Sequence, residues 1–99
     1  MAAKQLDVHP TALAELKSAL IWYRERNESA AVKFAAEVDR AVASVIESPE
    51  RWPREDDGTR KFTLRRFPFA LIYREKTDAI QLLAIAHGHR RPGYWKERL

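Results

Sequence analysis

The sequence contains no cysteine, which excludes disulfide bonds and metal sites that depend on thiolate ligands. It has only three glycines, too few for a glycine-rich loop that binds nucleotide phosphates. No apolar run approaches the roughly 18 residues that a membrane-spanning helix needs. Residues 1–7 contain no apolar core of signal-peptide length. We therefore expect a cytoplasmic protein without membrane contact, and we expect neither a metal nor a cofactor.

The 99 residues are enough for one domain, which we expect to span the whole chain. The hydrophobic fraction of 45% is ordinary for a folded globular domain. The charge is unevenly distributed, because residues 1–49 hold six basic and seven acidic side chains, whereas residues 50–99 hold twelve and seven. The basic second half is therefore expected to bind an acidic partner, such as RNA, DNA or an acidic protein segment.

One strand and two helices are predicted in the first half. Gln5–His9 alternates polar and apolar residues, as a short strand does. Pro10 then opens a helix, because proline is tolerated in a first turn. Asn27 interrupts the helical pattern, Ser29 is the expected cap of a second helix, and that helix ends near Ser48–Pro49. The short link predicts an antiparallel helical hairpin. Apolar stripes support both helices: Leu13, Leu16, Leu20 and Tyr23 in the first, and Ala31, Phe34, Val38, Ala41, Val42 and Val45 in the second.

Three strands are predicted after a polar loop, at Arg60–Arg66, Phe67–Arg74 and Ala79–His87. Alternation along the first of them predicts Lys61 and Arg65 on the sheet face opposite the helices. The last strand is almost wholly apolar, so we expect it to be central and covered on both faces. The predicted fold class is α+β: an N-terminal strand and an antiparallel helical hairpin packed on one face of a mainly antiparallel four-stranded sheet, in the order β-α-α-β-β-β.

Ionisable and aromatic side chains are concentrated where the last predicted strand ends. Arginine offers a planar fork that suits phosphate, histidine can move protons near neutral pH, and tyrosine and tryptophan can stack on bases. The set that could cleave RNA without a metal consists of Arg65, His87, Arg90 and Tyr94. Further residues predicted to bind a nucleic acid or protein partner are Arg60, Lys61, Arg91, Trp95 and Arg98.

The same residues also fit plain structural roles. Alternating basic and apolar residues are typical of any half-exposed strand. Tyr94 and Trp95 can fold the tail back over the core. His87 can be a hydrogen-bonded structural histidine at a strand end. His87 and His89 have no evident third partner, so no metal site is predicted.

Several segments, taken together, resemble toxins of the RelE/ParE superfamily. Arg65–Arg74 and Ile85–Trp95 are similar to the C-terminal half of those toxins. In the first half, His9–Pro10, Trp22–Tyr23 and the segment Pro49–Pro53 resemble the plasmid-stabilisation branch. The resemblance covers nearly the whole chain. It implies the toxin of a bacterial type II toxin–antitoxin system, which slows growth and is neutralised by a cognate antitoxin in a hetero-oligomer. It also implies contact with operator DNA only through that antitoxin.

The superfamily divides by target. RelE-like members cleave messenger RNA on the ribosome, and Arg65, Arg90 and Tyr94 match the arginines and tyrosine that the resemblance assigns to that role. The matching strand has only Lys61, fewer lysines than the best-developed nucleases. ParE-like members inhibit DNA gyrase and need no nuclease residues. The long hairpin favours gyrase inhibition. A metal-independent endoribonuclease is the alternative, because residues 87–94 are rich in catalytic residue types. A third possibility is a basic nucleic-acid-binding module without toxicity.

Overall fold

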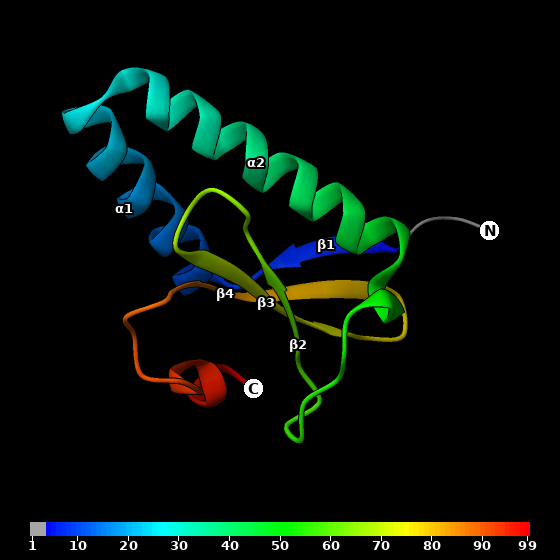
Figure 1. The fold of residues 1–99 in the computed structure, drawn as a ribbon. Coiled ribbons are helices and arrows are strands. Elements are labelled where there is room, and N and C mark those ends of the chain that lie inside the picture. The colour runs from blue at the N-terminus through cyan, green and yellow to red at the C-terminus, as the bar shows by residue number, and fades with distance from the viewer. Residues whose placement is uncertain (1–3) are drawn as a thin grey trace.

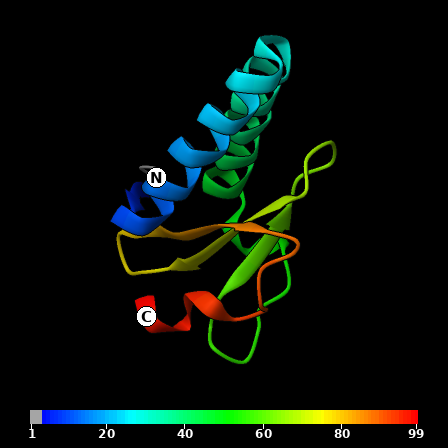
Figure 2. The same ribbon diagram turned by 90° about the vertical axis from the view of Figure 1, so that its left-hand side faces the viewer.

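A computed structural model describes residues 4–99. Its elements follow the predicted order β-α-α-β-β-β, with two short 3-10 helices added. They are β1 (Gln5–Val8), α1 (Pro10–Arg26), α2 (Glu28–Glu47), η1 (Pro49–Arg51), β2 (Arg60–Thr63), β3 (Phe69–Glu75), β4 (Ala79–His87) and η2 (Tyr94–Arg98). The helical hairpin covers one face of the sheet, and η2 lies against the other face (Figure 1, Figure 2). The predicted fold class is confirmed.

The four strands form one sheet in the order β1-β4-β3-β2. β1 pairs in parallel with β4, and the other two pairs are antiparallel. β4 therefore lies inside the sheet, and six of its nine residues are buried beneath α1 on one face and η2 on the other. Its bounds are those predicted from its apolar run. This strand matters for function because the chain leaves it at His87 and enters the basic tail.

Local capping explains where the helices begin. His9 caps α1, since its Nδ1 accepts a hydrogen bond from the Thr11 N–H at 3.1 Å. β1 consequently ends at Val8 and not at His9. α2 is capped by Asn27, whose Oδ1 accepts from the Ala30 N–H at 3.1 Å, so the prediction of Ser29 was wrong. Asn27 ends one helix and starts the next, and this makes the hairpin link very short.

Small side chains bring α1 close to the sheet. Ala12 and Ala19 are buried against it, whereas Leu13 is 42% exposed. The predicted apolar stripe of α1 was therefore wrong at Leu13. The larger α2 stripe was right, because Phe34, Val38, Ala41 and Val45 are all buried. The close approach of α1 places its polar side chains directly above the end of β4.

β2 and β3 are shorter at their shared turn than predicted. β2 ends at Thr63 and β3 begins at Phe69. The reason is a carboxylate on α2: Glu37 Oε2 accepts from the Arg65 and Arg66 N–H groups at 2.7 and 3.2 Å. Those amides are unavailable to a strand ladder, and Pro68 has no N–H to offer. Arg65 is thus held on the helix side of the sheet, not on the opposite face as predicted.

The core lies between the helices and the sheet. An aromatic group at its centre joins Phe34 to Tyr23, Phe67 and Phe69, with ring centroids 5.2, 5.2 and 5.3 Å apart. Trp52 closes one end by packing on Phe62 at 4.7 Å. On the opposite sheet face a smaller apolar patch is covered by Tyr94 and Trp95; it consists of Ala70, Ile72, Ala84 and Ala86.

Candidate functional site

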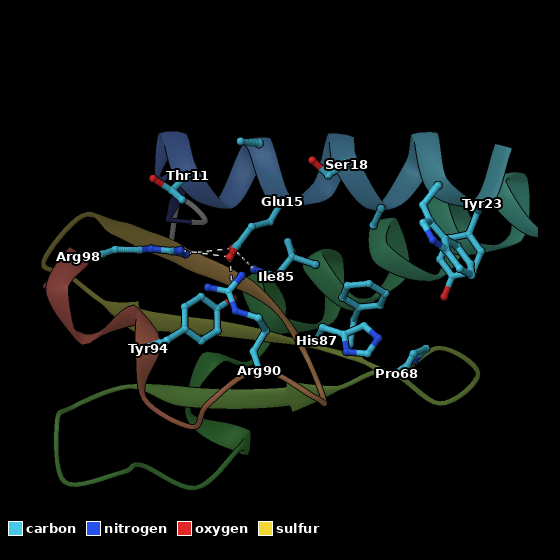
Figure 3. A pocket seen from close by; sticks show the side chains of 14 residues that line it. Thr11, Glu15, Ser18, Tyr23, Pro68, Ile85, His87, Arg90, Tyr94 and Arg98 are labelled. Atoms are coloured by element: carbon cyan, nitrogen blue, oxygen red, sulfur yellow. Dashed lines mark hydrogen bonds and ion pairs between the residues drawn. The ribbon is translucent and has the colours of Figure 1, made fainter. Parts of the chain in front are cut away.

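A pocket of about 590 Å³ lies between α1, the end of β4 and the C-terminal tail. Figure 3 shows α1 forming one wall, with Glu15 pointing from it towards Arg98 and Tyr94. The residues that line the pocket are Thr11, Ala14, Glu15, Ser18, Ala19, Trp22, Tyr23, Pro68, Phe69, Ile85, His87, Arg90, Tyr94 and Arg98. Eight of them are apolar or tyrosine, and the ion pair between Glu15 and Arg98 lies at the tail end with Arg90 nearby. The α1 residues recur every three or four positions, so one face of the helix supplies them.

Glu15 accepts hydrogen bonds from three other residues at this pocket. Its two carboxylate oxygens accept from Arg98 Nη1 at 3.0 Å and Nη2 at 3.1 Å, which is a bidentate ion pair. Oε2 also accepts from the Tyr94 hydroxyl at 2.6 Å, and Oε1 accepts from the Ile85 N–H at 3.0 Å. Arg98 Nη1 donates in addition to the Leu83 carbonyl at 2.8 Å. One α1 side chain therefore ties η2 to β4.

This network shifts the pKa values of Glu15 and Tyr94. Burial raises the pKa of Glu15, but hydrogen bonds from Arg98, Tyr94 and the Ile85 N–H, with the charge of Arg98, outweigh it and leave the pKa below its usual 4.5. Burial, the hydrogen bond donated to Glu15 and the charge of that carboxylate raise the pKa of Tyr94 to about 12. Glu15 is thus charged and Tyr94 neutral across the physiological range.

The tyrosines give a direct test of this environment. Burial raises the pKa of Tyr23, and it raises the pKa of Tyr73 to about 12, as for Tyr94, so two of the three tyrosines ionise well above their usual 10. A folded-state pKa above 10 contributes stability that is full below pH 10 and lost as the pH rises through about 12. We expect the step in phenolate absorbance near pH 10 to account for at most one of the three tyrosines in the folded chain and for all three in urea. A step near pH 10 that becomes smaller in Tyr94→Phe would contradict the buried placement of Tyr94.

Two ionisable side chains of the pocket stay available to a ligand. The Arg90 guanidinium lies 4.0 Å from the centre of the Tyr94 ring, so its N–H groups are held at the rim by a cation–π contact and not by a carboxylate. His87 stands edge-on to Phe69 at 4.9 Å and stacks on His89 at 5.1 Å. Its Nδ1 accepts from the His89 N–H, which leaves Nε2 as the free ring nitrogen. His87 therefore lines the pocket and does not point into the core.

Trp22 forms the far rim of the pocket. Its side chain is 51% exposed, stacks against the Arg26 guanidinium at 3.9 Å and meets Tyr23 edge-on at 5.1 Å. A large exposed aromatic that is already held in place is typical of a binding anchor, since little side-chain entropy is lost on contact. The pocket thus offers an apolar wall that ends in a tryptophan at one side and a free arginine at the other.

Comparison with known proteins identifies the family. Residues 6–92 match the family described as "ParE toxin of type II toxin-antitoxin system, parDE". The chain belongs to the ParE toxin family. Its fold is similar to a solved structure described as the chromosomal ParDE TA system from P. aeruginosa, with a TM-score of 0.74 and 26% identity over 86% of this chain and 96% of that one. No curated protein matches the chain. The expected resemblance to the RelE/ParE superfamily is confirmed.

In this ParE-family chain the predicted nuclease residues do not gather in one place. Arg90, His87 and Tyr94 line the pocket, but Arg65 lies beside Glu37 and Arg40 on α2. The hydroxyl of Tyr94 is occupied by Glu15. Across residues 4–99 no group of three or more His, Cys, Asp or Glu residues is placed to hold a metal ion.

The other predicted binding residues are also dispersed. Arg60 pairs with Glu75 at 3.3 Å and donates to the Trp52 carbonyl at 2.6 Å, so it stabilises the fold. Arg98 is engaged by Glu15. Trp95 packs on the small side chains of the open sheet face, where Lys61 also lies. Arg91 is exposed in the tail. Binding roles for these residues stay predictions.

Sequence reasoning missed Glu15 and Trp22 as site residues. Glu15 falls between Ala12 and Ala19, so a carboxylate beside a buried stripe was the available signal. Nothing local pointed to Arg98 as its partner, which is 83 residues away in the sequence. No helix within residues 4–99 is long and apolar enough to cross a membrane.

Proposed function

We propose that this chain inhibits DNA gyrase as a ParE-family toxin, acts in the cytoplasm and is neutralised by a cognate antitoxin. The observation that carries the proposal is that Glu15 holds both Tyr94 and Arg98. Tyr94 is the tyrosine of the predicted nuclease set, and Arg98 is a predicted binding residue at the end of the same tail. Their engagement leaves a preformed pocket with a free arginine and an exposed tryptophan, which suits binding another protein better than cleaving RNA.

The raised pKa of Tyr94 also argues against a nuclease. A general acid or base works best when its pKa lies near the operating pH. The pKa of Tyr94 is raised to about 12, and its proton points at a carboxylate of the same chain. Arg65, the expected phosphate ligand, lies beside α2 and does not line the pocket. A metal-independent endoribonuclease would have to rearrange both groups before it could act.

The pocket also supports an antitoxin as partner. Family membership and the likeness to a ParDE structure favour such a partner. The wall formed by Ala14, Ala19 and Phe69 suits an apolar side chain, and Arg90 at the rim suits an adjacent carboxylate. An amphipathic segment that bears both features would cover Trp22 as well. Neutralisation follows if that segment occupies the surface that the toxin presents to its target.

The experiment that tests the target is a short pulse of expression without any antitoxin, with DNA and protein synthesis followed by uptake of labelled precursors. We expect DNA synthesis to stop first and a DNA-damage response to follow. In parallel, the purified chain should inhibit DNA supercoiling by purified gyrase. Arrest of protein synthesis first, with transcripts cut within codons, would show an endoribonuclease. Normal growth and normal gyrase activity would show a chain without toxicity.

A further inference from the structure

A second hollow, of about 440 Å³, lies between α2 and the β2–β3 turn. It is lined by Arg40, Ala41 and Ser44 of α2, by Arg65 and Arg66 of the β2–β3 turn, and by Glu37 and Phe62; we call it the arginine hollow. Its three arginines are all exposed. It shares no lining residue with the pocket between α1 and the tail. The two sites are therefore distinct.

The only carboxylate of the arginine hollow does not neutralise its arginines. Glu37 Oε2 accepts from the backbone N–H groups of Arg65 and Arg66 at 2.7 and 3.2 Å. The ion pairs formed within residues 4–99 involve Glu15 and Glu75 as acids, and none includes Arg40, Arg65 or Arg66. Glu37 instead holds the turn on α2, so that two consecutive guanidinium groups are presented beside a third. The hollow is a positioned cluster of free cations.

The basic surface continues along α2. Lys33 stands four residues before Glu37 and seven before Arg40, so helical spacing places it on the same side, and it is exposed. Seven residues of helix span about 10 Å at 1.5 Å per residue. Lys33 and Arg40 thus lie about 10 Å apart along a rigid helix, with Arg65 and Arg66 of the turn beside Arg40, and at 3.4 Å per nucleotide this length covers about three phosphates of one strand. Such a row suits a polyanion with regularly repeated charges.

We propose that the arginine hollow binds the phosphodiester backbone of duplex DNA. Arginine forks match phosphate oxygens. A single strand would need an exposed aromatic on which to stack its bases, but Phe62 is half-buried against Trp52, 4.7 Å away. A protein partner would need an exposed apolar anchor, and the hollow has none beyond Phe62 and the buried Ala41. The inference goes beyond gyrase inhibition and departs from the expectation that operator DNA is contacted only through the antitoxin.

The test measures binding of the purified full chain to a short fluorescent DNA duplex of arbitrary sequence, by anisotropy over a series of salt concentrations. The triple variant Arg40→Gln, Arg65→Gln, Arg66→Gln should reduce the slope of log affinity against log salt by about 2 to 3, since each phosphate contact contributes roughly 0.9. The matched control is Lys17→Gln, Arg24→Gln, Lys76→Gln, which removes the same charge from exposed positions outside the hollow. It should change the slope by less than about 1.

A single substitution tests whether the arginines must be positioned. Glu37→Ala removes a negative charge, so a purely electrostatic surface would bind the duplex more tightly. Because it also releases the turn that carries Arg65 and Arg66, the proposed site should bind less tightly. Circular dichroism and a thermal melt establish that each variant is folded before its binding is compared.

Three results would overturn the proposal. Equal slopes for the two triple variants would show general electrostatic attraction. Tighter binding by Glu37→Ala would show that the turn has no positioning role. Dependence on the three arginines for a fluorescent oligoglutamate peptide, but not for the duplex, would make the hollow a site for an acidic polypeptide. None of these results bears on gyrase inhibition, which the supercoiling assay measures separately.

Discussion

Replacing Glu15 with alanine is expected to lower the free energy of unfolding by about 3 to 5 kcal/mol, the usual cost of leaving one partner of a buried ion pair alone. The Arg98 and Glu15 side chains are only 12% and 15% exposed, so water screens the pair weakly. The substitution also leaves the Tyr94 hydroxyl and the Ile85 N–H without their acceptor. A domain of this size has roughly 5 to 15 kcal/mol in total. The measurement is urea unfolding followed by circular dichroism.

The matched control is Glu25→Ala, which removes an exposed carboxylate from the same helix and should cost no more than about 0.5 kcal/mol.

The ion pair between Glu15 and Arg98 also predicts that stability depends on pH. Because the folded-state pKa of Glu15 lies below its usual 4.5, its contribution is full above pH 4.5 and is lost as the pH falls through the lower folded-state value. The difference in unfolding free energy between wild type and Glu15→Ala should therefore become smaller in acid. A small difference at neutral pH would show that other contacts hold the tail.

Removing the free side chains at the two rims of the pocket is expected to abolish gyrase inhibition. Arg90→Ala and Trp22→Ala should each raise the concentration of toxin needed to block supercoiling by about 30-fold or more, the effect of losing an interface hot spot. Tyr94→Phe should change it by no more than about threefold, because the lost hydroxyl faces Glu15 and not the pocket opening. A nuclease would behave differently, since loss of a proton-transfer group typically costs about 100-fold or more in rate.

The neighbour of Trp22 provides a matched control. Ile21 is 52% exposed, against 51% for Trp22, but it does not line the pocket. Ile21→Ala should leave inhibition unchanged. Equal losses in Ile21→Ala and Trp22→Ala would mean that the target recognises the exposed side of α1 in general. Full loss of toxicity in Tyr94→Phe, with the fold intact, would favour the endoribonuclease over gyrase inhibition.

The two sites involve different helices of the hairpin and suit different kinds of partner. α1 and the tail form a pocket with an apolar wall, which suits a protein partner. α2 and the β2–β3 turn carry cations that meet no carboxylate side chain. A toxin that binds an enzyme already bound to DNA would gain from contacts of both kinds. The expected salt dependence of DNA binding and the supercoiling assay test the two faces independently.

Much of the fold was predictable because its signals are local. α1 begins at Pro10 and ends before Asn27, and β4 spans the predicted Ala79–His87. Errors arose where a distant group competes with a local pattern. The alternation of polar and apolar residues continues from 61 to 65, yet the carboxylate of Glu37, 28 residues earlier, accepts the hydrogen bond of the Arg65 N–H. The exposure of Leu13 has the same origin, since packing against β4 selected the small Ala12 and Ala19 for the buried side of α1.

The amino-acid sequence was sufficient for the family, the order of elements, the central strand and the concentration of basic residues after it. These follow from periodicity, proline, asparagine and charge, which act over a few residues. Only the tertiary structure decides which arginines lack a carboxylate partner. Arg98 and Arg60 looked as available as Arg90 and Arg65, but the first two meet Glu15 and Glu75 after folding. A charge is neutralised by whatever lies within a few ångströms, and the 83 residues that separate Glu15 from Arg98 in the chain leave no local trace of that contact.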